Sequence, residues 1–200
     1  MEDKGFIMID GSHLFSSIYT IWRERPVFNK KKLNIGVFNE ALASKWEDNI
    51  GQVIRTIYYF KQNDKRQKEM LIIPDSSVPG RKNHWHIKEC GVSIKSIPEE
   101  ELQELPQKYR DHFQRAEKGL DVKLAYDTLL FLSQGVARNF VFLLNDRDYI
   151  PLFEAIHSLG GNVYLTALDS TLNIQKGLAN LADRCLTLDS ELKAIFGITA

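Results

Sequence analysis

The feature that most constrains the fold is an alternation of short apolar runs with segments of helical periodicity. Residues 6–9 form an apolar run that reaches Asp10 and is followed by Gly11, which is typical of a buried parallel strand that turns into a helix. Further strands are predicted over residues 55–60, 92–97, 139–144 and 162–166. Apolar residues spaced three or four positions apart predict helices over 122–132 and 150–157.

Strands that alternate with helices predict the α/β class, with an open parallel sheet of about five to six strands and helices on both faces. Ligands of such sheets bind beyond the carboxyl ends of the strands, so the functional site is expected there. We find no internal repeat, so residues 1–200 are expected to form one domain. Surface loops or short helices are expected over 26–33, 61–69 and 98–114, and an amphipathic helix over 82–91.

Composition excludes several classes of protein. A chain that is 44% hydrophobic and 26% charged has the balance of a packed domain rather than a disordered segment. Because 26 Lys and Arg balance 26 Asp and Glu, the net charge gives no bulk attraction to nucleic acid. Local positive charge or a metal ion must therefore supply any such attraction. The two unpaired cysteines predict a reducing compartment, and without a signal sequence or membrane span we expect a cytoplasmic protein with no membrane partner.

Aspartates stand where the predicted strands end. Asp10 ends the first strand, Asp146 and Asp148 follow the strand at 139–144, and Asp121 lies at the start of a helix. Carboxylates that converge at one edge of a sheet would hold a hard divalent cation, Mg²⁺ or Mn²⁺. For Asp121 and Asp148 the spacing equally allows a helix-capping role.

Several segments resemble the NYN domain, a branch of the PIN-like nuclease superfamily. FIMIDGSHL at 6–14 is similar to the opening strand and turn of that family, and KGLDVKLAYD at 118–127 to its block KGxDVxLxxD. NDRDYIPL at 145–152 is similar to SGDxDFxPL, and residues 181–188 resemble the closing strand. The blocks occur in family order over nearly the whole chain.

The resemblance implies a PIN-like fold and a metal-dependent endoribonuclease in which four acids bind the metal and act in catalysis: Asp10, Asp121, Asp146 and Asp148. Two departures from the family pattern bear on activity. His13 replaces an asparagine, and Leu144 with Asn145 replaces a small Ser-Gly pair, which crowds the approach of a phosphate. Asn145 is still able to hydrogen-bond a phosphate.

RNA contacts are expected around this rim and on local basic clusters. The residues predicted to bind substrate are Ser12, His13, Asn145, Arg147, Arg81 and Lys82. The basic groups at 30–32 and 61–68 fit either an RNA track or solvated faces.

The aromatic side chains fall into two groups, those suited to RNA stacking and those expected in the core. Possible stacking residues are Tyr58, Tyr59 and Trp22, whereas Trp85 is expected to be a core or loop anchor. Core positions are expected for Tyr19, Phe28 and Phe38. His84, His86 and Cys90 supply only three of the four ligands of a structural zinc site, so zinc is disfavoured.

These observations favour an endoribonuclease that hydrolyses mainly single-stranded RNA with a metal-activated water. The alternative is a degenerate NYN domain that binds RNA or a protein without cutting, for which the two departures argue. A phosphohydrolase or receiver-like domain is a third, weaker possibility. A homo-oligomer or a protein partner stays open.

Overall fold

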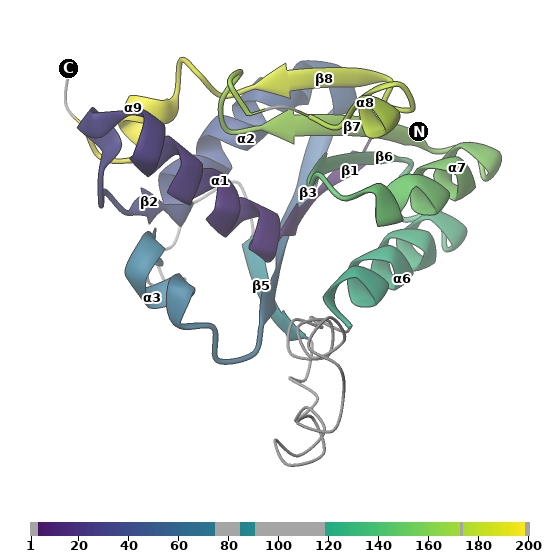
Figure 1. The fold of residues 1–200 in the computed structure, drawn as a ribbon. Coiled ribbons are helices and arrows are strands. Elements are labelled where there is room, and N and C mark those ends of the chain that lie inside the picture. Colours follow the sequence, from purple (N-terminus) through teal and green to yellow (C-terminus); the bar gives the residue numbers. More distant parts are fainter. Residues whose placement is uncertain (1–3, 75–84, 91–118, 173, 199–200) are drawn as a thin grey trace, which may run out of the picture.

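The fold is built on a six-stranded sheet in which every neighbouring pair of strands is parallel. The computed structural model describes residues 4–74, 85–90, 119–172 and 174–198 (Figure 1). The strand order is β5-β3-β1-β6-β7-β8, and a smaller parallel pair joins β2 to β4. The strands are β1 (Lys4–Asp10), β2 (Leu33–Asn34), β3 (Gln52–Lys61), β4 (Leu71–Ile72), β5 (Trp85–Cys90), β6 (Asn139–Leu143), β7 (Asn162–Ala167) and β8 (Arg184–Thr187). The predicted α/β fold is confirmed.

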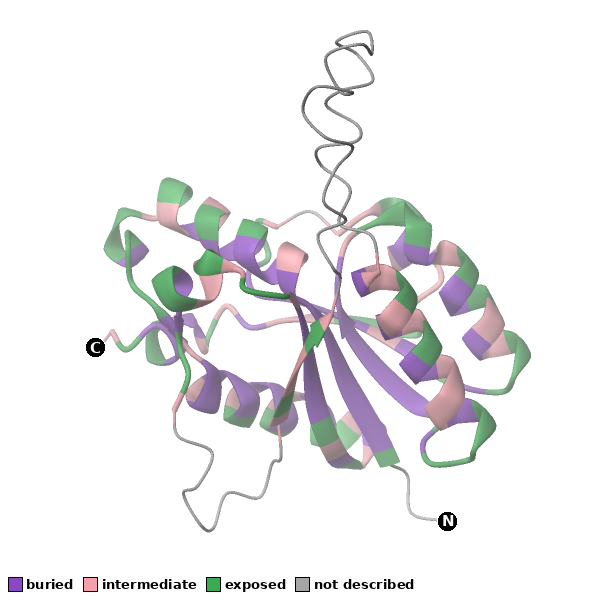
Figure 2. Ribbon diagram, turned by 90° about the horizontal axis from the view of Figure 1, so that it is seen from below, coloured by how far each residue is buried: buried purple, intermediate pink, exposed green. Residues whose placement is uncertain are grey.

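Helices cover both faces of this sheet. Figures 1 and 2 show α1 and α2 on one face and α6 and α7 on the other. The helices are α1 (Gly11–Glu24), α2 (Ile35–Ile50), α3 (Lys65–Met70), α6 (Leu120–Ser133), α7 (Ile150–Ser158), α8 (Lys176–Ala179) and α9 (Leu192–Ile195), with 3₁₀ turns η1 (Pro26–Phe28) and η2 (Arg147–Tyr149). Within the described ranges, no helix has the length and apolar character needed to cross a membrane.

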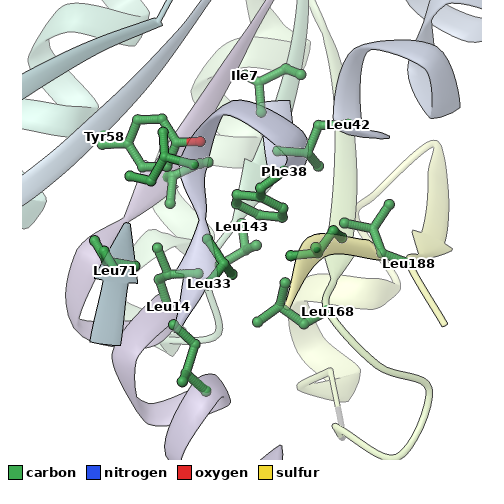
Figure 3. Close-up of a cluster of buried hydrophobic side chains, with 14 of the residues drawn as sticks. Ile7, Leu14, Leu33, Phe38, Leu42, Tyr58, Leu71, Leu143, Leu168 and Leu188 are labelled. Carbon is green, nitrogen blue, oxygen red and sulfur yellow. The ribbon is translucent and has the colours of Figure 1, made fainter. Parts of the chain in front are cut away.

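Strand β1 divides its side chains between two apolar cores. Ile7 and Ile9 are fully buried in the core beneath α1 and α2, part of which is seen in Figure 3. Phe6 and Met8 belong to the second core, beneath α6 and α7. Because successive strand residues point to opposite faces, Asp10 follows Phe6 and Met8 toward the α6 and α7 side.

The predicted helix over 82–91 is wrong, because residues Trp85–Cys90 form the edge strand β5. This strand pairs with β3 from Thr56 opposite Trp85 to Lys61 opposite Cys90. Trp85 and Ile87 pack on the α1 side and Cys90 on the other, so the segment has a period of two rather than a helical period. The predicted strand 92–97 and loop 98–114 lie outside the described residues.

Burial corrects three of the aromatic predictions. Tyr58 and Tyr59 are completely buried, so neither is available to stack on RNA. Tyr19 is 59% exposed and is not a core residue, whereas Phe28 and Phe38 are buried as predicted. The half-buried Trp22 donates its indole N–H to the Lys31 carbonyl, which is a structural contact.

Gly11 is expected to be essential for the junction of β1 and α1. A Cβ atom at this position would lie 2.5 Å from the Tyr59 carbonyl oxygen and would also overlap the Phe60 ring. Overpacking of this kind costs about 1–3 kcal/mol. Gly11→Ala should therefore lower the free energy of unfolding by this amount, as measured by urea denaturation. Gly177→Ala is the matched control, because its Cβ would meet only flexible side-chain atoms from 3.3 Å outward. Equal stabilities of the two variants would contradict the close approach.

Candidate functional site

Asp10 lies at the carboxyl end of β1 and caps the helix that follows. Its Oδ1 accepts hydrogen bonds from the backbone N–H groups of Ser12 (2.8 Å) and His13 (3.1 Å). The residue is only 6% exposed, and no lysine or arginine of the described chain forms an ion pair with it. Burial raises the pKa of Asp10 to about 6, and nearby Asp121 adds to the rise, although the hydrogen bonds act in the opposite direction.

Tyr149 connects Asp10 to the acid on α6. The buried Tyr149 hydroxyl lies 2.7 Å from Asp121 Oδ1 and 3.3 Å from Asp10 Oδ2. Asp121 is half-buried in the first turn of α6, and Tyr149 ends η2. Burial and the two carboxylates raise the pKa of Tyr149. Residues from β1, α6 and η2 therefore meet at one point on the carboxyl edge of the sheet.

Asp146 and Asp148 lie on the turn that leads into Tyr149, and both are exposed. The Asp146 Oδ1 accepts the backbone N–H of Asp148 at 3.0 Å and caps η2. Among the described residues, no group of three or more His, Cys, Asp or Glu is arranged to hold a metal ion. The structure thus brings Asp10 and Asp121 together around the Tyr149 hydroxyl, whereas Asp146 and Asp148 lie on the adjoining turn.

The alternative prediction that Asp121 and Asp148 cap helices is wrong. Gly119, with a left-handed φ of 113°, is the N-cap residue of α6, and Tyr149 is that of α7. Neither helix has a side-chain cap. Of the four acids at this edge of the sheet, Asp10 and Asp146 are the ones that cap a helix or turn.

The predicted substrate-binding residues occupy different environments. Burial lowers the pKa of His13 to about 4, so this half-buried side chain is neutral at pH 7, with Nε2 3.4 Å from the Ser17 hydroxyl. Asn145 Oδ1 accepts the backbone N–H of Gln175 at 2.6 Å and ties the end of β6 to the start of α8. Arg147 is exposed and forms no ion pair within the described ranges. Arg81 and Lys82 lie outside the described residues, and Ser12 is half-buried beside Asp10.

A second charged cluster, which the sequence interpretation missed, is centred on Asp127 of α6. The buried Asp127 carboxylate accepts hydrogen bonds from Lys88 (2.6 Å), Lys123 (2.7 Å) and the Tyr59 hydroxyl (3.0 Å). Burial alone would raise the pKa of Asp127, but the hydrogen bonds and charges of its partners outweigh burial and hold the pKa below its usual value. The strand register places Lys88 opposite Tyr59, and Tyr59 opposite Asp10.

The sequence contained signals for Tyr149 and Asp127, which were not among the predicted site residues. Tyr149 stands at the phenylalanine position of the block SGDxDFxPL, and Asp127 is the last acid of KGxDVxLxxD. In each case the motif showed the residue but not its partner.

The carboxylates of Asp10 and Asp121 have the donor atoms that a hard divalent cation requires. Carboxylate oxygens are the ligands that Mg²⁺ and Mn²⁺ prefer. Asp10 is a buried anion whose contacts in the described chain are two amides and one hydroxyl, rather than a cationic side chain. A bound cation would supply the missing positive charge.

The family model of the NYN domain matches residues 6–189. The chain belongs to the NYN family. NYN domains are part of the PIN-like superfamily, whose members are generally nucleases that use divalent metals. The resemblance of the four sequence segments to the NYN domain is therefore confirmed.

The NYN fold also agrees with a solved structure. A crystal structure of a protein of unknown function from Vibrio parahaemolyticus is similar, with a TM-score of 0.51 and 13% sequence identity over 95% of each chain. At this identity the likeness concerns the fold alone. A comparison with curated proteins gives no match for this NYN domain.

Proposed function

We propose that this NYN domain is a metal-dependent endoribonuclease that hydrolyses phosphodiester bonds in mainly single-stranded RNA. The observation that carries the proposal is the meeting of Asp10 and Asp121 at the carboxyl edge of the sheet, with Asp10 buried. The buried Asp10 carboxylate forms no ion pair with a described lysine or arginine, and its burial costs free energy that a divalent ion would offset. The family membership supports the same class of chemistry.

Asp10 and Asp121 are proposed to hold Mg²⁺ or Mn²⁺, with Asp146 and Asp148 contributing from the exposed turn. When bound, such a cation activates a water molecule and neutralises charge on the phosphate. The backbone amides of Ser12 and His13 fix one oxygen of Asp10, which orients the other toward the site. Because His13 is neutral at pH 7, it adds no positive charge that would compete with the cation.

The exposed residues near these acids are proposed to contact the RNA. Arg147 presents a guanidinium next to Asp146 and is suited to a phosphate. A contact from Asn145 to a phosphate would be made by its Nδ2 group, because a phosphate oxygen accepts hydrogen bonds and only Nδ2 can donate them. Arg81 and Lys82 stay part of the proposed RNA path.

Tyr126 is a better candidate for stacking on a base than the buried tyrosines. Its ring is 58% exposed on the outer face of α6, and Lys123 Nζ lies 5.1 Å from the ring centroid. An exposed aromatic ring suits a single-stranded nucleotide, because a base can stack on its accessible face.

A second candidate function is RNA or protein binding without cleavage. Two observations favour it. In the described part of the chain, no third acid joins Asp10 and Asp121 in a metal-binding group. Asn145 also has a structural role in holding Gln175, so its presence is explained without substrate.

Incubation of the purified protein with labelled single-stranded RNA separates these functions. We expect cleavage in Mn²⁺ or Mg²⁺, none in EDTA, and products with 5′-phosphate and 3′-hydroxyl ends, because water rather than the 2′-hydroxyl attacks phosphorus. Cleavage that persists in EDTA, or 2′,3′-cyclic phosphate ends, would exclude the proposed mechanism. RNA binding without cleavage at any metal concentration would favour the binding module.

Asp146→Asn is expected to lower the cleavage rate by about 10- to 100-fold without unfolding the protein. The side chain is exposed, and an asparagine still offers an oxygen to cap η2. Asp48→Asn is the matched control, because Asp48 is an exposed aspartate on α2, on the opposite face of the sheet. Equal rates for both variants would remove Asp146 from the proposed site.

A further inference from the structure

The hydroxyl group of Tyr149 lies between two acidic side chains from distant parts of the chain. It is 2.7 Å from Asp121 Oδ1 and 3.3 Å from Asp10 Oδ2. The tyrosine is 2% exposed, and its backbone N–H donates to the Asp146 carbonyl at 3.2 Å, so burial and the η2 turn both restrict the position of the ring. The location of the hydroxyl is therefore a consequence of the fold.

The oxygens of Asp10 have different partners. Oδ1 accepts two backbone amides, which also cap α1, so this oxygen is committed to the fold. Oδ2 faces the hydroxyl of Tyr149. The oxygen of Asp10 that is oriented away from the helix cap is thus the one that the tyrosine contacts.

A tyrosine hydroxyl has a single proton, so it cannot donate fully to two carboxylates at once. The shorter distance, to Asp121, identifies the stronger hydrogen bond, and the 3.3 Å contact to Asp10 is weaker. The hydroxyl still separates two acids that would otherwise face each other in a poorly hydrated site.

We propose that Tyr149 is a positioning residue that holds the site in a cation-free form. Its hydroxyl bridges Asp10 and Asp121 through the oxygens that a divalent cation would use, so the hydroxyl and the cation compete at this position. Because Mg²⁺ binds its oxygen ligands at about 2.0–2.1 Å, the cation and the hydroxyl proton compete for the same lone pairs. Tyr149 thereby sets the concentration of cation at which the site is filled.

This inference rests on the proposed function only for the identity of the cation. The bridge between the two acids is a property of the described structure and needs no RNA. Its test therefore measures cation binding and stability, and RNA cleavage is measured separately.

The deciding experiment compares Tyr149→Phe with Tyr58→Phe. The control also removes a buried hydroxyl, which donates to Asn39 Oδ1 at 2.8 Å, but among the described residues that hydroxyl contacts no acid. Binding of Mn²⁺ is measured by calorimetry, and the electron paramagnetic resonance spectrum of bound Mn²⁺ reports its ligand environment. We expect Tyr149→Phe to bind Mn²⁺ about tenfold more tightly than the wild type, with a changed spectrum, because hydrogen bonds to charged groups are worth this much or more. Tyr58→Phe should match the wild type in both measurements.

Thermal unfolding adds a measurement that does not depend on cleavage. In EDTA, Tyr149→Phe should lose more melting temperature than Tyr58→Phe, because it alone leaves two carboxylates without their shared donor. Saturating Mn²⁺ should then raise its melting temperature by more than that of the wild type.

Unchanged or weaker Mn²⁺ binding by Tyr149→Phe would overturn the inference, even if the wild type cleaves RNA. Tighter binding by the variant, with no cleavage by either protein, would sustain the inference and reject the nuclease. If neither the wild type nor Tyr149→Phe binds Mn²⁺, the proposed competition between the hydroxyl and a cation would be wrong.

Discussion

Asp10→Asn is expected to weaken Mn²⁺ binding by more than about 100-fold and, in EDTA at pH 7, to raise the free energy of unfolding by about 2 kcal/mol. Loss of a group that only supports a metal ligand already costs 10- to 100-fold in affinity, so loss of a buried ligand should cost more. The gain in stability follows from burial, which raises the pKa of Asp10 to about 6, so its charge at pH 7 opposes folding.

The asparagine should keep the local structure, because the cap of α2 shows the same arrangement. Asn34 Oδ1 accepts the backbone N–H groups of Gly36 and Val37, as Asp10 Oδ1 does for Ser12 and His13. Calorimetry with Mn²⁺ and urea unfolding in EDTA measure the two effects on one preparation. A variant that is destabilised in EDTA, or that binds Mn²⁺ like the wild type, would show that Asp10 serves the fold rather than a cation.

Asp127→Ala is expected to lower the free energy of unfolding at pH 7 by about 3 kcal/mol. Removal of one partner from a buried ion pair costs about 3–5 kcal/mol, and the lower value applies because Lys88 and Lys123 are partly exposed. The variant also leaves the hydroxyl of the fully buried Tyr59 without its acceptor. Urea unfolding gives the magnitude directly.

The pH dependence of this difference has a definite sign. The pKa of folded Asp127 lies below its usual value, so its stabilising effect is complete above the unfolded pKa of about 4 and is lost as the pH falls through the folded pKa. The gap between wild type and Asp127→Ala should therefore be constant near neutrality and shrink in acid. Glu191→Ala is the control, since the half-exposed pair with Lys45 at 3.3 Å should contribute less than about 1 kcal/mol. Similar losses for both variants would contradict the buried cluster.

Most of the sheet could be predicted from the sequence because its inner strands are largely apolar and buried. The strands β1, β3, β6 and β7 and the helices α6 and α7 agree with their predicted segments. The edge strand β5 could not be predicted, because four of its six residues are half-exposed and two are exposed, so it lacks the apolar run that marks the inner strands. The alternation of its side chains between the two faces becomes recognisable only from its pairing with β3, in which Thr56 lies opposite Trp85.

The candidate site was predictable as a place but not as a set of contacts. Parallel topology brings Asp10 and Asp121 to one edge, as the strand ends indicated. The bridging role of Tyr149 depends on its contacts with Asp10 of β1 and Asp121 of α6, which no local sequence pattern encodes. Likewise, Tyr59 has the residue type of a stacking platform, but its central strand buries it against α6. The division into one domain, the cytoplasmic location and the roles of Arg81 and Lys82 stay predictions.

The central claim is that Asp10 and Asp121 bind a divalent cation, and anomalous diffraction from a crystal soaked in Mn²⁺ tests it most directly. We predict an anomalous peak in contact with Asp10 Oδ2 and an oxygen of Asp121, and no peak there in the Asp10→Asn variant under the same conditions. A wild-type crystal saturated with Mn²⁺ that shows no peak between these two carboxylates would contradict the account.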